Sequence, residues 1–173
     1  MSKISLFSFK LIITLFCISF LNASLYAENS TNHLKTIIFG AGCFWGVEKK
    51  FQESYGVVNV ESGYADGKNI QPVYKEIIKK ENKFNPNNFA EVVKVTYNSN
   101  QTDLESLVKI FFEIHDPTQI NRQGNDIGVQ YRSLILTNTI EEINISEKVK
   151  NNYQNLLSKK GYGQITTDIK KNT

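Results

Sequence analysis

The order of strand-like and helix-like segments constrains the fold of this chain more than any other feature of its sequence. An apolar run at 34–39 predicts a strand, and an amphipathic stretch at 44–53 predicts a helix. A second strand is expected within 56–63, and the strict alternation over 91–97 predicts a third. The segment 64–88 is rich in Asn, Lys and Pro, and it is predicted to be a long loop with one helical turn.

Two helix-start signals organise the second half of the chain. The segments 102–105 (Thr-Asp-Leu-Glu) and 139–142 (Thr-Ile-Glu-Glu) both have the form of a capping box. The apolar stripe of the first helix is Leu104, Leu107, Val108, Phe111 and Phe112. The second helix is expected to be buried through Ile143, Val149, Tyr153 and Leu156. Strands are predicted at 132–136 and 165–169, whereas the stretch between the first helix and 132 shows no regular period.

This order predicts an α+β fold. Strand, helix, strand, strand, helix, strand matches the ferredoxin-like split βαβ arrangement, here with an extra C-terminal helix and strand and with long irregular active-site loops. The 173 residues have room for one domain. Gly40-Ala41-Gly42 lacks the third glycine of a dinucleotide-binding turn, so a nucleotide site is not favoured.

The first 27 residues have the features of a secretory signal peptide. Two lysines precede an apolar stretch at 11–21, and small residues suited to cleavage follow it. That stretch is shorter than the roughly 20 apolar residues that span a membrane. We therefore expect a signal peptide at 1–27, export to the periplasm, and a mature domain over 28–173.

Removal of this segment changes the charge and the cysteine count. The net charge falls from +3 to +1, because the segment holds two lysines and no acid, and this is too little to favour nucleic-acid binding. Of the two cysteines, Cys17 leaves with the segment and Cys43 stays. A single thiol in an exported protein cannot form an internal disulfide, and it suggests a reactive or intermolecular role.

Cys43 lies between Gly42 and an amphipathic segment, at a predicted strand-to-helix turn. The unpaired N–H groups and the dipole at a helix start favour the thiolate over the thiol. The alternative is that Cys43 is a small buried apolar residue. Phe44 and Trp45 either pack in the core or form an apolar wall for a small alkyl group.

Glu91 heads the clearest strand and shares the parity of its core-facing residues. Burial would raise the pKa of this carboxyl and keep it protonated, but a strand-end Glu can also turn into solvent, and the sequence leaves both open. His115 permits Cys/His hydrolase chemistry, although it also suits a helix C-terminus as a partner of the dipole. Asn125 to Gly128 is a polar turn, and Tyr131 follows it.

Taken together, these motifs strongly resemble the A-type peptide methionine sulfoxide reductases over residues 36–169. The motifs that carry the resemblance are Gly42-Cys43-Phe44-Trp45-Gly46, Gly63-Tyr64-Ala65, Ala90-Glu91-Val92, His115-Asp116-Pro117-Thr118-Gln119 and Arg122 to Ser133. The resemblance implies that Cys43 is the nucleophile and that Glu91 protonates the sulfoxide oxygen. It further implies a methyl-binding wall of Phe44 and Trp45, two oxygen-binding phenols on Tyr74 and Tyr131, and an organising Asp126.

The implied activity is the reduction of methionine S-sulfoxide in proteins, in peptides and as the free amino acid. Cys43 would become a sulfenic acid, and an external thiol, either a thioredoxin-like protein or a small thiol, would regenerate it. No bound cofactor or metal is implied. The expected partners are oxidised proteins or peptides and the reductant, with no nucleic acid, no membrane after signal cleavage, and a monomeric state. The implied role is protein repair under oxidative stress.

The sequence departs from the family pattern at three places. Asn88-Phe89 stands where the family has Gly-His before Ala-Glu, and the loop between Tyr74 and Glu91 is longer. No resolving cysteine follows Cys43. The family also continues beyond 169 with an aromatic, acidic and histidine-bearing segment, so a C-terminally truncated domain is expected. The alternative function is therefore a catalytically inactive remnant of the same fold that acts at most as a binding module.

Overall fold

The computed structural model describes residues 33–68 and 70–172. The predicted signal peptide, 1–27, therefore lies outside the described residues. The chain divides into Met1–Leu34 and Lys35–Thr173, and the elements that carry the site belong to the second of these units. Within the part that is described, no helix is both long and apolar enough to cross a membrane.

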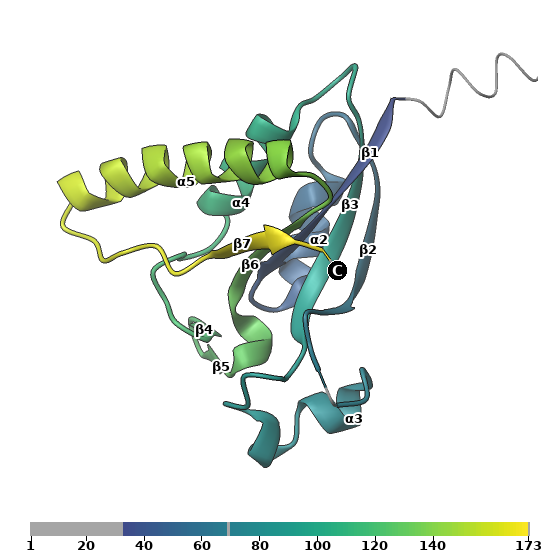
Figure 1. The fold of residues 1–173 in the computed structure, drawn as a ribbon, viewed down its shortest axis with the longest axis vertical. Helices are drawn as coiled ribbons and strands as arrows, with labels where there is room; N and C mark the ends of the chain where they lie inside the picture. The colour runs from purple at the N-terminus through teal and green to yellow at the C-terminus, as the bar shows by residue number, and fades with distance from the viewer. Residues whose placement is uncertain (1–32, 69, 173) are drawn as a thin grey trace, which may run out of the picture. The chain divides into compact units, whose positions relative to one another are not determined.

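A five-stranded sheet forms the centre of this unit, with the strand order β2-β3-β1-β6-β7 (Figure 1). Its strands are β1 (Leu34–Ala41), β2 (Val57–Ala65), β3 (Ala90–Asn98), β6 (Ser133–Thr137) and β7 (Asp168–Lys171). β2 pairs antiparallel with β3, and β1 pairs antiparallel with β6, whereas β7 adds to β6 in parallel. The four strands β1, β2, β3 and β6 have the order of a split βαβ fold, so the predicted fold class is confirmed.

The main core lies between the sheet and three helices: α2 (Phe44–Gln52), α4 (Leu104–Glu113) and α5 (Ile140–Lys159). The ring of Phe39 on β1 stacks at a centroid distance of 4.8 Å on Phe51 of α2 and at 5.1 Å on Phe111 of α4. Burial of an aromatic side chain of this kind contributes about 1.5–3 kcal/mol. This stack holds the first helix, and with it the turn that carries Cys43, against the sheet.

Short elements occupy the two irregular stretches of the sequence. The segment after β2 contains α3 (Tyr74–Ile77) and the 3-10 turn η1 (Lys80–Asn82). The segment after α4 contains the two-residue strands β4 (Arg122–Gln123) and β5 (Asp126–Ile127), which pair with each other, and the 3-10 turn η2 (Val129–Tyr131). α3 and the β4–β5 pair lie toward the same end of the sheet in Figure 1. The one helical turn predicted within 64–88 corresponds to α3, whereas η1, η2 and the β4–β5 pair are short elements that the sequence does not predict.

Several boundaries differ from the sequence-based predictions. The capping box predicted at Thr102 is wrong, because Asp103 is the N-cap of α4 and its Oδ1 accepts a hydrogen bond of 2.7 Å from the Ser106 N–H. The box at Thr139 is confirmed. Leu156 is 56% exposed rather than buried, because the C-terminal end of α5 runs past the strands (Figure 1). The last strand is β7, at Asp168–Lys171, rather than 165–169.

Candidate functional site

The candidate nucleophile lies at the turn between β1 and α2. Cys43 is the N-cap residue of α2, half-buried and free. Gly42 takes a φ of +91°, and a Cβ at this position would come within 2.7 Å of the Gln123 Cβ atom, so only glycine fits this turn. The thiol is thereby placed at a helix start, where backbone N–H groups lack helical partners and the dipole favours an anion.

Glu91, the second residue of β3, lies beside this helix start and not in solvent. Its side chain is 5% exposed, and its Oε2 atom accepts a hydrogen bond of 3.2 Å from the Phe44 N–H. Burial raises the pKa of Glu91, and the negative charge of Asp126 raises it further, although the Phe44 hydrogen bond acts in the opposite direction. A carboxyl with a raised pKa keeps a proton to higher pH, as a proton donor requires.

Tyrosine side chains surround this carboxyl. Tyr64 at the end of β2 is the direct cross-strand partner of Glu91, and its ring lies 5.7 Å from that of Phe44 between centroids. Tyr131 ends the η2 turn, and Tyr74 begins α3. Burial, and then the charge of Glu91, raise the pKa of both Tyr64 and Tyr131. These phenols therefore stay protonated and can donate hydrogen bonds.

One cavity of about 480 Å³ brings the candidate residues together. Its lining residues are Cys43, Phe44, Trp45, Tyr64, Tyr74, Glu91 and Tyr131. Trp45 is 77% exposed and Tyr74 is 60% exposed, so these two side chains form the rim, whereas Glu91 lies at a buried wall. The cavity thus places an acid and a thiol beneath an aromatic entrance.

Asp126 lies outside the cavity, whereas Tyr64 lies inside it. Asp126 lies on β5, is exposed, and does not line the cavity, but its charge raises the pKa of both Glu91 and Tyr131. Tyr64 lines the cavity although no role was predicted for it. The signal was present in the sequence, because Tyr64 belongs to the Gly63-Tyr64-Ala65 motif, but its pairing opposite Glu91 depends on the sheet register.

His115 does not join the site. Its Nδ1 atom lies 2.7 Å from the carbonyl oxygen of Phe111, and its Nε2 atom lies 2.7 Å from the Ser133 hydroxyl. Burial lowers the pKa of His115 to about 4. Both ring nitrogens therefore have partners away from the cavity, and this arrangement does not support the Cys/His hydrolase alternative.

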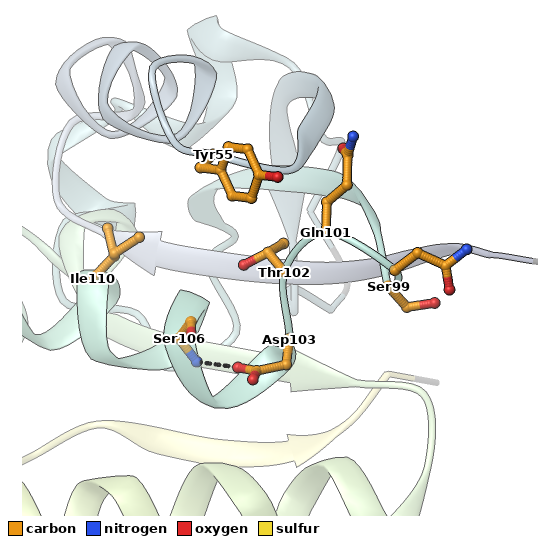
Figure 2. A pocket seen from close by; sticks show the side chains of 8 residues that line it. Tyr55, Ser99, Gln101, Thr102, Asp103, Ser106 and Ile110 are labelled. Atoms are coloured by element: carbon orange, nitrogen blue, oxygen red, sulfur yellow. Dashed lines mark hydrogen bonds between the residues drawn. The ribbon is translucent and has the colours of Figure 1, made fainter.

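A second hollow, of about 490 Å³, lies at the start of α4 (Figure 2). Its lining residues include Tyr55, Thr102 and Ile110, and its carboxylate is Asp103, which is directed at the Ser106 N–H as the helix cap. No thiol or histidine lines it. Among the described residues there is no cluster of side chains suited to hold a metal ion. The Cys43 cavity is thus the better candidate for chemistry.

The arrangement around Cys43 suits the reduction of a polar bond between oxygen and a soft atom such as sulfur. A thiol at a helix start can attack a soft electrophilic atom. The Glu91 carboxyl, whose pKa is raised by burial, and the phenols can donate to the oxygen that takes up negative charge. The aromatic rings of Phe44 and Trp45 offer an apolar surface for the group attached to the electrophile.

Comparison with known proteins gives consistent results. The family model described as "Peptide methionine sulfoxide reductase" matches residues 35–173. A relative from Rhodospirillum centenum, "Peptide methionine sulfoxide reductase MsrA", is 43% identical over 79% of this chain and 60% of its own length. The solved structure "Methionine sulfoxide reductase A of Corynebacterium diphtheriae" aligns with a TM-score of 0.73 and 38% identity, over 80% of this chain and 65% of that one.

A further solved structure is described as Mxr1 from Saccharomyces cerevisiae in complex with Trx2. It aligns with a TM-score of 0.58 and 25% identity, over 82% of this chain and 78% of that one. This chain spans between 54% and 60% of the length of the first curated relatives that it matches.

Proposed function

Because this chain belongs to the peptide methionine sulfoxide reductase family, we propose that it reduces methionine S-sulfoxide in proteins and peptides, and as the free amino acid, to methionine. The observation that carries the proposal is the cavity in which free Cys43 and buried Glu91 meet at the start of α2. A sulfoxide is a poor electrophile until its oxygen is protonated, and this cavity supplies both the acid and the nucleophile.

The reaction transfers the sulfoxide oxygen to the sulfur of Cys43. Glu91 gives its proton to the sulfoxide oxygen while the Cys43 thiolate attacks the sulfur atom. This attack joins the Cys43 sulfur to the substrate sulfur. The oxygen then moves to the Cys43 sulfur as the substrate S–O bond and the new S–S bond both break, so that methionine leaves and Cys43 carries the oxygen as a sulfenic acid. The sulfoxide gains two electrons and Cys43 loses two, so the exchange needs no further reactant.

The other lining residues bind and orient the substrate in this proposal. Phe44 and Trp45 hold the methyl group on sulfur, since their rings form the apolar part of the cavity. Tyr74 and Tyr131 donate hydrogen bonds to the sulfoxide oxygen. Asp126 acts at longer range, because its charge helps to keep Glu91 protonated.

Regeneration is assigned to an external thiol. Cys43 is the only cysteine among the described residues. One thiol attacks the sulfenic acid and releases water, and a second thiol then breaks the mixed disulfide and restores Cys43. The relative Mxr1 has been solved in complex with Trx2, which supports a thioredoxin-like reductant, and a small thiol is the alternative.

Turnover of a methionine sulfoxide peptide by the purified chain, with dithiothreitol as reductant, tests this function. We expect reduction of the S diastereomer, and we expect Cys43→Ser to abolish it. A folded parent chain that produces no reduced peptide would favour the alternative of an inactive remnant that only binds. Cleavage of an ester or amide that requires His115 would instead indicate a hydrolase.

Export remains part of the proposal. The lysine-flanked apolar stretch at 11–21 supports a cleaved signal peptide and a periplasmic location. Expression in a bacterium with a periplasm, followed by N-terminal sequencing of the periplasmic fraction, tests it. A mature N-terminus near residue 28 is expected, and a full-length chain that stays in the cytoplasm would contradict it.

A further inference from the structure

Arg132 lies directly after Tyr131 and just before β6, outside the lining of the cavity. Its side chain is only 15% exposed. The Nη1 group donates to two backbone carbonyl oxygens, that of Asn88 at 3.1 Å and that of Val129 at 2.9 Å. These acceptors belong to segments 44 and 3 residues away in sequence. One end of a single guanidinium group therefore joins the chain before β3 to the η2 turn.

The Nη2 group of Arg132 joins a third segment. It donates to the backbone carbonyl of Asp66 at 2.8 Å and to the Oδ2 atom of the same residue at 2.9 Å. Asp66 has a φ of +60°, which is a left-handed conformation that L-residues other than glycine rarely adopt. Such a conformation persists when surrounding contacts hold it, and here Arg132 contacts both the backbone and the carboxylate.

Each segment held by Arg132 carries a residue of the cavity. Asp66 follows Tyr64 by two residues, Asn88 precedes Glu91 by three, and Val129 precedes Tyr131 by two. Tyr64 and Glu91 are also opposite each other in the β2–β3 pair. The guanidinium lies outside the cavity and holds the three backbone segments that position Glu91, Tyr64 and Tyr131.

Asn88 connects Arg132 to a further residue of the cavity, Tyr74. Its side chain is fully buried, and its Nδ2 group donates to the carbonyls of Ile77 and Asn82, both at 2.9 Å. Ile77 is the last residue of α3, the helical turn that begins with Tyr74. The rim residue Tyr74 is therefore connected to Arg132 through one buried amide side chain.

We propose that Arg132 is the positioning residue of this site, and that its guanidinium holds the Glu91 carboxyl and the tyrosine phenols in the arrangement that the sulfoxide oxygen requires. This inference rests on the proposed function. The planar guanidinium presents its N–H donors in a rigid fork, and four of its hydrogen bonds are to these segments. An ammonium group cannot reproduce the fork, so Lys is not a conservative replacement here.

Steady-state kinetics of Arg132→Lys with free methionine sulfoxide and dithiothreitol provide the first test. We expect kcat to fall by about 10²-fold, because misplacement of a catalytic group by about 1 Å costs that much. KM should change little, since Arg132 forms no hydrogen bond with Phe44 or Trp45, which make up the apolar wall. A fall in kcat at constant KM marks the loss of an interaction that is made only in the transition state. Lys170→Met is the matched control.

Lys170 forms an ion pair with the same Asp66 carboxylate at 2.8 Å but donates to none of the three carbonyls. The Lys170→Met substitution removes the positive charge beside the Asp66 carboxylate and leaves the hydrogen bonds of Arg132 in place. We therefore expect kcat of Lys170→Met within about threefold of the parent, on the scale of a partly exposed ion pair. An equal loss in both variants would assign the effect to the charge on Asp66 and overturn the positioning role.

Hydrogen exchange measured by mass spectrometry separates this proposal from the proposed function. In folded Arg132→Lys, exchange should accelerate together at 64–68, 88–91 and 128–131, while α4 stays protected. Unchanged exchange at these three segments, or a parent-like kcat despite faster exchange, would overturn the positioning role. If the parent chain reduces no sulfoxide, the proposed function is wrong, but the exchange data still decide whether Arg132 holds the segments.

Discussion

At the scale of single residues, we expect Glu91 to act as the proton donor of the reaction. Burial raises the pKa of this carboxyl, so the acid form is retained to higher pH than for an exposed Glu. Glu91→Gln keeps the shape but removes the transferable proton, and loss of a positioned acid costs about 10²–10⁴-fold in rate. The rate constant for reduction in a single turnover measures this loss. A parent-like rate would make Glu91 a structural residue.

His115 gives a second expectation at this scale, for stability rather than activity. Burial lowers its pKa from 6.5 to about 4, so the unfolded chain takes up a proton first as the pH falls. The stability contributed by neutral His115 is therefore complete above about pH 6.5 and is lost as the pH falls from there to about 4. The free energy of unfolding falls by at most about 3 kcal/mol over this window. The difference in unfolding free energy between the parent and His115→Gln, measured by urea titration, should shrink over this window. A constant difference would contradict it.

At the scale of secondary-structure elements, the two helix caps separate what the sequence specifies from what it does not. Thr139 caps α5 as predicted, with both hydrogen bonds of the box present. In α4 the same pattern is displaced by one residue, because Thr102 packs against Gly56 and Asp103 turns to the Ser106 N–H. Local patterns therefore predict that a helix starts, and a tertiary contact decides at which residue.

The displaced cap of α4 is open to measurement. Asp103→Ala removes the acceptor of the Ser106 N–H and should lower the unfolding free energy by about 1 kcal/mol. Thr102→Ala removes no cap hydrogen bond and should cost less. Chemical denaturation of both variants makes the comparison, and a larger loss for Thr102→Ala would favour the predicted box over the observed cap.

The site shows the same division at the level of the elements that build it. Periodicity locates Cys43 at the start of a helix and Glu91 near the start of a strand. It does not decide whether Glu91 is buried, because a carboxyl at a strand end can also turn into solvent. It also cannot place Tyr64 or the guanidinium fork of Arg132 in the site. Their contacts join segments far apart in sequence, and they depend on sheet register and on a loop whose order comes from the buried side chain of Asn88.

At the scale of the whole molecule, the expectation concerns the fate of Cys43 after one turnover. The described residues hold no second cysteine to trap the oxidised form. Stoichiometric sulfoxide without reductant should therefore add one oxygen to the Cys43 peptide, visible by mass spectrometry and trappable by a sulfenic-acid reagent. An internal cross-link with loss of two hydrogens, or an unchanged thiol after product release, would contradict this.

The exposed rim of the cavity has an optical consequence. The chain contains a single tryptophan, and it is Trp45, two residues from Cys43 and 77% exposed. All indole fluorescence of the protein therefore arises at the entrance to the cavity. Oxidation of the neighbouring sulfur, the arrival of a substrate methyl group on the ring, or the docking of a reductant each changes the polarity around that indole. The molecule thus carries an indole emission signal with no second indole elsewhere in the chain, by which each step at Cys43 can be timed in a stopped-flow experiment.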